Sequence, residues 1–176
     1  MRGWIRHGLM VLLAGSLAAC NTAKPPPARQ GPPSTAYAKV MPAPATAARG
    51  QCLNDQETQT VRGRIIQQEL AFAARHCNMT PEYNQFAGKF DADLRANGNE
   101  LGGLLRRRGV NINTYVTDVA NKTATRASTY GGFCTDAREA FRWALQPSTS
   151  RLADVPPLYD NSADHGTRPC NPPKAR

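Results

Sequence analysis

The stretch Asn54–His76, NDQETQTVRGRIIQQELAFAARH, decides the fold class. Its apolar residues recur every three or four positions, as they do along one side of an α-helix. Two adjoining stripes result: Val61, Ile65, Gln68 and Phe72, and Ile66, Leu70, Ala73 and Cys77. Asn54 or Asp55 can cap this helix, and Glu57 falls in its first turn, where the helix dipole favours an anion. The pattern predicts a long helix that opens the domain.

Four further segments show helical spacing. The second begins at Thr80-Pro81, with threonine as cap and proline at the first helical position, and ends at Asn97-Gly98. A short third helix carries Leu101, Leu104 and Leu105 and ends at Gly109; Asn113 caps a fourth; the fifth covers Phe133–Leu145. No segment indicates a strand or a repeat. We therefore expect an all-α domain at residues 52–146, a small antiparallel bundle of four to five helices.

The segments on both sides of this domain have a different composition. Residues 20–51 are rich in proline and alanine, with Pro25-Pro26-Pro27 and Pro32-Pro33, and contain few large apolar side chains. Such a segment buries too little surface to offset its ordering entropy, which predicts a flexible, extended tether. Residues 147–176 are rich in Pro, Ser, Asp and Asn, and we expect an irregular C-terminal tail.

The N-terminus has the pattern of an export signal. Arg2 and Arg6 precede an apolar run, Gly8–Ala19, that is too short to span a bilayer. The run ends in Leu17-Ala18-Ala19-Cys20, which resembles the lipobox of bacterial lipoproteins. That resemblance implies that residues 1–19 are removed and that Cys20 becomes an acylated N-terminus, carrying palmitate or similar chains. Asn21 stands where an aspartate would favour the inner membrane, so the expected location is the periplasmic face of the outer membrane.

The formal net charge of +9 lies mainly outside the expected domain. Residues 52–146 carry twelve basic and ten acidic side chains, whereas no acidic residue precedes Asp55. Basic residues beside a membrane are attracted to anionic headgroups. Nucleic-acid binding is the common alternative for a basic chain, but an exported protein rarely meets nucleic acid. We expect the membrane as a partner, and no nucleic acid.

Four cysteines remain once Cys20 is assigned to the lipid: Cys52, Cys77, Cys134 and Cys170. An even number in an exported domain predicts two disulfides, with three connectivities. A straight helix between Cys52 and Cys77 would hold them more than about 30 Å apart, which excludes that pair because bridged Cα atoms lie within about 7 Å. Counting chain reversals favours Cys134 near Cys52, and pairing Cys134 with Cys77 is nearly as good. Both alternatives tie the tail to the domain.

Few residues indicate catalysis or metal binding. There is no Cys-x-x-Cys pair, so we expect no metal and no cofactor. A cell-wall glycan hydrolase could use one glutamate on a helix, with Glu69 and Glu100 as candidates, but the chain is short and shows no carbohydrate-binding motif. The charge cluster Arg106-Arg107-Arg108 closes the third helix. It favours either stabilisation of the helix end or an anion site for lipid phosphates, acidic glycans or a partner protein.

The domain resembles a group of small exported helical proteins of proteobacteria. The resemblance covers roughly residues 52–145 and rests on Gln67-Gln68-Glu69-Leu70, Cys77, Tyr83-Asn84-Gln85-Phe86, Leu94, Gly98, Tyr115, Ala120-Asn121, Phe133-Cys134 and Phe141. It implies a helical domain in which the first three domain cysteines recur, without a catalytic set, and makes Cys170 a plausible fourth partner.

These observations predict a lipid-anchored envelope protein that acts by binding and is not an enzyme. Candidate roles are maintenance of the envelope, assembly of a surface structure, or inhibition of a toxin or lytic enzyme, as a periplasmic inhibitor or immunity protein does. A glycan hydrolase is the alternative.

Overall fold

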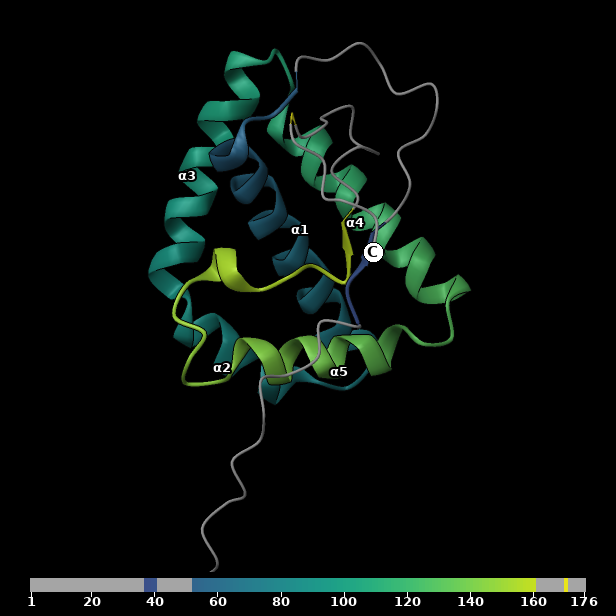
Figure 1. Cartoon of the computed structure of the whole chain (residues 1–176). Helices are drawn as coiled ribbons and strands as arrows, with labels where there is room; N and C mark the ends of the chain where they lie inside the picture. Colours follow the sequence, from purple (N-terminus) through teal and green to yellow (C-terminus); the bar gives the residue numbers. More distant parts are fainter. Residues whose placement is uncertain (1–36, 41–51, 161–169, 171–176) are drawn as a thin grey trace, which may run out of the picture. The chain divides into compact units, whose positions relative to one another are not determined.

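The structure is a computed structural model that describes residues 37–40, 52–160 and 170. The described part contains five α-helices, a short 3-10 helix (η1) and two strands of two residues each (Figure 1). In chain order these are β1 Lys39–Val40, α1 Asp55–His76, α2 Thr80–Lys89, α3 Asp91–Arg107, α4 Ile112–Thr129, α5 Phe133–Ala144, η1 Leu152–Asp154 and β2 Tyr159–Asp160. The expectation of a helical bundle braced by disulfides is confirmed.

Helix α1 is the centre of the domain. It contacts each of the other four helices, and α5 runs crosswise to it (Figure 1). Its start is a capping box: Asn54 Oδ1 accepts a hydrogen bond from the Glu57 amide (2.9 Å), and Glu57 Oε2 accepts one from the Asn54 amide (3.1 Å). The cap that the sequence indicates is therefore present, at Asn54.

The second and third helices divide at a different place from the one that the sequence predicts. Asn97-Gly98 lies inside α3, and the break falls at Phe90. Phe90 is 2 % exposed and packs on Phe86. A turn at Phe90 keeps both rings in one apolar cluster while the leucines of α3 enter a second cluster. Burial of these side chains outweighs the helix-breaking tendency of Asn-Gly.

Two predicted caps are also wrong. Thr80 is the first residue of α2 rather than its cap, and its hydroxyl donates to the Ala74 carbonyl oxygen (3.1 Å), which ties α2 to the end of α1. The cap of α4 is Asn111 instead of Asn113. Asn111 Oδ1 accepts from the amides of Asn113 and Thr114 (2.9 and 3.2 Å), so the asparagine two residues earlier satisfies the free amides.

The core consists of two apolar clusters. The first joins α1, α2, α5 and the tail through Ile66, Leu70, Phe86, Phe90, Phe133, Phe141, Leu152, Val155 and Leu158. The second joins α1, α3 and α4 through Leu53, Val61, Ile65, Leu101, Leu104, Leu105, Tyr115 and Val119. Helix α1 therefore contributes to both clusters, which explains why its apolar residues form two stripes.

Helices α1 and α3 approach closely at Gly63. A Cβ atom at this position would lie 2.7 Å from Asn97 Nδ2, closer than van der Waals contact allows. That nitrogen donates to the Thr60 carbonyl oxygen (2.7 Å), so it is held in place. Gly63, which looks like a weak point within the helix, is required by the crossing.

Replacing Gly63 with alanine is expected to lower the free energy of unfolding by about 1–3 kcal/mol, because the methyl group displaces Asn97. Gly88→Ala is the matched control. Nothing lies within 4 Å of its added methyl group, and alanine favours the helix by about 0.5–1 kcal/mol. Chemical denaturation of both variants measures the difference. If Gly63→Ala is as stable as Gly88→Ala, the crossing is not tight.

Both disulfides are present, as Cys52–Cys170 and Cys77–Cys134, with Cα–Cα distances of 4.9 and 5.5 Å. The exclusion of a Cys52–Cys77 bridge is confirmed. Of the two remaining arrangements, the count of chain reversals favours the wrong one, because it assumes helices of similar length and direction. Helix α5 instead runs crosswise, which brings Cys134 to the end of α1 at Cys77 (Figure 1).

Two segments outside the helices contribute to the core, contrary to the sequence interpretation. Within the expected tether, Tyr37 is 3 % exposed and its hydroxyl donates to the Pro156 carbonyl oxygen (3.1 Å). Burial raises the pKa of Tyr37 well above its usual value, so the hydroxyl remains a donor. Strand β1 pairs in parallel with β2 in the tail, which the sequence does not indicate because each strand has only two residues.

The remainder of the expected tether, the signal peptide and Cys20 lie outside the described residues. Among the described helices, none combines the length and apolar character needed to cross a bilayer.

Candidate functional site

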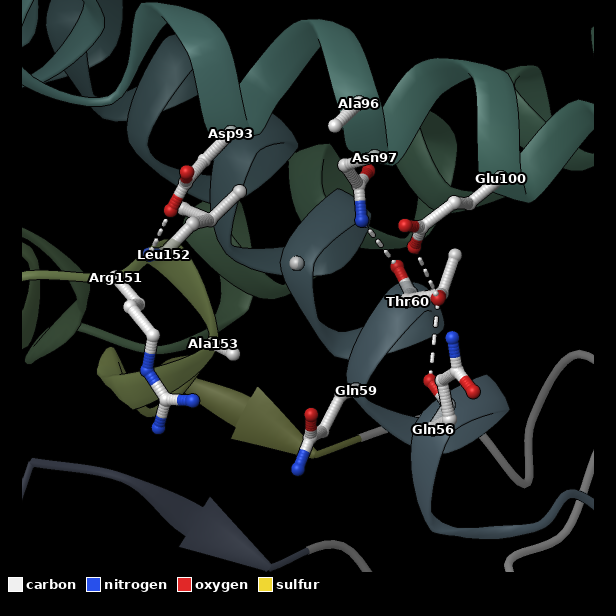
Figure 2. A pocket seen from close by; sticks show the side chains of 11 residues that line it. Gln56, Gln59, Thr60, Asp93, Ala96, Asn97, Glu100, Arg151, Leu152 and Ala153 are labelled. Atoms are coloured by element: carbon white, nitrogen blue, oxygen red, sulfur yellow. Dashed lines mark hydrogen bonds between the residues drawn. The ribbon is translucent and has the colours of Figure 1, made fainter.

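The candidate site is a groove of about 250 Å³ between α1, α3 and η1 (Figure 2). Four of its lining residues are small or apolar, Gly63, Ala96, Leu152 and Ala153. The other seven are polar: Gln56, Gln59, Thr60, Asp93, Asn97, Glu100 and Arg151. Ligand pockets are usually more apolar than this and begin near about 300 Å³. The groove is therefore suited to one side chain or one sugar ring.

Helical spacing explains how these side chains come together. Asp93, Asn97 and Glu100 are four and three residues apart, so they share one face of α3. Gln56, Thr60 and Gly63 repeat that spacing on α1. The two faces meet where the Asn97 amide binds the Thr60 carbonyl, and Figure 2 shows this pair between the two ends of the groove.

Each carboxylate of the groove uses one oxygen for an internal hydrogen bond. Asp93 Oδ2 accepts from the Leu152 amide (2.7 Å), which fixes η1 against α3. Glu100 Oε2 accepts from the Thr60 hydroxyl (3.0 Å). At the open edge, Arg151 pairs with Asp154 (2.6 Å), and this hydrogen bond raises the pKa of the guanidinium. The carboxylates and glutamines leave the groove able to bind hydroxyl or amine donors.

Glu69, the other glutamate candidate, lies elsewhere and is completely buried. Its Oε2 accepts from the Leu158 amide (2.8 Å) and its Oε1 from the Tyr159 amide (3.1 Å). Both carboxylate oxygens hold the tail, and no solvent reaches them. Only Glu100 of the two glutamates therefore lies where a ligand could contact it.

The three arginines of the cluster Arg106-Arg107-Arg108 differ in their contacts and exposure. Arg108 Nη2 donates to Glu57 Oε2 (2.8 Å) and to the Cys52 carbonyl oxygen (3.1 Å), so this side chain joins α3 to the start of α1. Arg107 has a side chain 68 % exposed and lies 3.8 Å from Glu57, and Arg106 is exposed. An anion site built on this cluster would use Arg106 and Arg107, since both are exposed and the Arg107–Glu57 pair is longer than the Arg108–Glu57 pair.

Sequence reasoning missed Gln56, Gln59, Asp93 and Arg151. The spacing of Asp93, Asn97 and Glu100 could have indicated a shared polar face, had Asn97-Gly98 not been interpreted as a helix end. Arg151 could not have been found, because the position of the tail depends on contacts such as the Asp93–Leu152 hydrogen bond. Within the described residues, no group of three side chains is arranged to hold a metal ion.

Comparisons with protein-family models, curated proteins and solved structures gave no match. The function of the domain is therefore inferred from the contacts of its own residues.

Proposed function

We propose that this chain is an exported lipoprotein, acylated on Cys20, whose helical domain binds a component of the cell envelope. The observation that carries the proposal is the pair of disulfides, Cys52–Cys170 and Cys77–Cys134. Disulfides persist in oxidising compartments such as the periplasm. The signal-like N-terminus and the lipobox-like residues that end at Cys20 also favour export and lipidation. Together these features support a location at the periplasmic face of the outer membrane.

The groove supports binding of a polar envelope component. Its exposed glutamines can accept or donate hydrogen bonds, and the carboxylate of Glu100 can accept them. Acidic and amide side chains suit a sugar with free hydroxyls, as in the cell wall. We assign this chemistry to the groove between α1, α3 and η1.

The same geometry makes glycan hydrolysis the second candidate. Glu100 lines the groove, so its carboxyl group could contact a bound glycan. However, glycosidases normally place a second carboxylate across the bond, at about 5–10 Å. Asp93 lies on the same helix, two turns away, and its Oδ2 is bound to the Leu152 amide. Binding without hydrolysis fits these contacts better.

The anchor is tested by intact-mass analysis of protein from its native host. The expected product begins at an acylated Cys20, and the Cys20→Ser variant should lack the mass of the acyl chains. An unmodified or full-length N-terminus would contradict the proposal.

The binding role is tested by sedimenting the mature protein with purified, insoluble cell wall. The mature protein should co-sediment, release no soluble fragments, and lose most of its binding when Gln59→Ala and Glu100→Gln are combined. Arg138→Gln, an exposed change on α5 outside the groove, is the control and should bind as the parent does. Release of fragments that Glu100→Gln abolishes would establish the hydrolase instead, and equal binding by the groove variant would remove the groove from the proposal.

A further inference from the structure

The connection between α3 and α4 combines exposed positive charge with exposed apolar side chains. We call it the α3–α4 tip and define it by Arg106, Arg107, Val110 and Ile112. All four side chains are exposed. Val110 and Ile112, each 37 % exposed, are two of the three large apolar residues exposed in the described part of the chain, with Tyr130 as the third. The tip therefore combines two exposed arginines with two of the few large apolar side chains that are exposed in the described part of the chain.

The charge of the tip is strongly one-sided. No acidic residue occurs between Glu100 and Asp118, a stretch that contains all three arginines. Glu57 of α1 lies 2.8 Å from Arg108 and 3.8 Å from Arg107, and Glu100 lines a hollow with Arg107, so the acidic side chains lie on the α1 side of the arginines. The first turn of α4 also has no acidic residue. The field at the tip consequently attracts anions.

The backbone holds the tip in a fixed form. Gly109 has a φ of 68°, which a glycine adopts without strain, and the Val110 amide donates to the Leu105 carbonyl oxygen (2.9 Å). These are the features of a Schellman helix end. Asn111 then caps α4 through the amides of Asn113 and Thr114. Val110 and Ile112 are thus presented on either side of a capped turn, beside the arginines.

We propose that the α3–α4 tip rests on a bilayer that contains anionic phospholipids. Arg106 and Arg107 bind headgroup phosphates, and Val110 and Ile112 enter the boundary between headgroups and acyl chains. The charge complementarity selects an anionic lipid surface, and the apolar pair distinguishes it from a soluble anion. This contact deepens the proposed function, because a chain already held at a membrane meets that surface at high effective concentration.

The length of the tether permits this contact. Residues 21–36, sixteen in number, separate Cys20 from the buried Tyr37. A chain of that length reaches at most roughly 55 Å, whereas the 22 residues of α1 span about 33 Å. The maximum reach of the linker therefore exceeds the length of α1, and the linker does not keep the tip from a bilayer.

The test uses the mature chain, residues 20–176, with Cys20→Ser, so that neither an acyl chain nor the apolar run Gly8–Ala19 obscures a weaker contact. Flotation with vesicles of phosphatidylglycerol and phosphatidylcholine should recover the protein, and pure phosphatidylcholine should not. Arg106→Gln with Arg107→Gln should lower the partition coefficient at least about tenfold, given the attraction of each basic residue to an anionic surface. Val110→Ser with Ile112→Ser should lower it several-fold and leave a contact that about 0.5 M salt abolishes.

The control removes the same charge elsewhere. Arg75→Gln with Arg138→Gln replaces two exposed arginines on α1 and α5, and should change the partition less than twofold. Thermal melting verifies that all variants are folded. Equal losses in the two arginine pairs would show attraction by net charge alone and overturn the proposal, as would flotation with neutral vesicles. Lipidation of Cys20 is measured independently by mass, so failure of the anchor and failure of the tip are distinguishable.

Discussion

Replacing Cys52 and Cys170 together with serine is expected to lower the free energy of unfolding by about 4–5 kcal/mol. The bridge joins residues 118 positions apart, so it removes much of the conformational freedom of the unfolded chain. It also holds the tail beside the start of α1, where the Cys170 amide donates to the Leu53 carbonyl oxygen (2.7 Å). Chemical denaturation of the variant and of the parent protein measures the change.

The second bridge supplies the comparison. Cys77–Cys134 spans 57 positions, about half as many, and each doubling of a loop changes the closure entropy by only about 0.6 kcal/mol. Removing either bridge should therefore have a similar effect. If the Cys52/Cys170 variant unfolds at the same denaturant concentration as the parent, the bridge does not constrain the unfolded chain, and the contacts of residues 152–159 alone hold the tail.

The sequence predicts correctly those elements whose patterns depend on residues close together in the chain. The capping box at Asn54 and the apolar repeat between Val61 and Ala73 depend on residues within one or two helical turns, and α1 and α5 occur where these patterns predict them. The exclusion of a Cys52–Cys77 bridge was also reliable, because it required only the length of one helix.

The features that sequence did not predict depend on distant contacts. Asn97-Gly98 resembles a helix end, but Asn97 donates to Thr60 across the crossing and α3 continues through it. Tyr37 is isolated among prolines and becomes buried only because Pro156 and the first cluster receive it. The groove also depends on a contact between residues that are far apart in the sequence, because the hydrogen bond from the Leu152 amide to Asp93 positions η1.

Replacing Glu69 with leucine is expected to destabilise the domain by about 3–5 kcal/mol. The side chain is completely buried, and its two oxygens accept the amides of Leu158 and Tyr159. Leucine fits a buried position but leaves both amides without these acceptors, and each unsatisfied buried donor costs about 1–3 kcal/mol. Glu69→Gln retains one acceptor oxygen, so its effect should be intermediate, at about 1.5–3 kcal/mol.

Glu139→Gln is the matched control, because it makes the same chemical change at an ion pair with Arg142 whose arginine is 61 % exposed. Its effect should stay below about 1 kcal/mol. Hydrogen exchange adds a local measurement: in Glu69→Leu the amides of Leu158 and Tyr159 should exchange faster relative to the helix amides, since the carboxylate that protects them is gone. If both amides exchange as slowly as in the parent protein, the apolar contacts of the tail hold it in place and Glu69 does not. Loss of protection together with reduced stability would establish that the buried Glu69 side chain fixes the tail, whose η1 segment forms one wall of the groove.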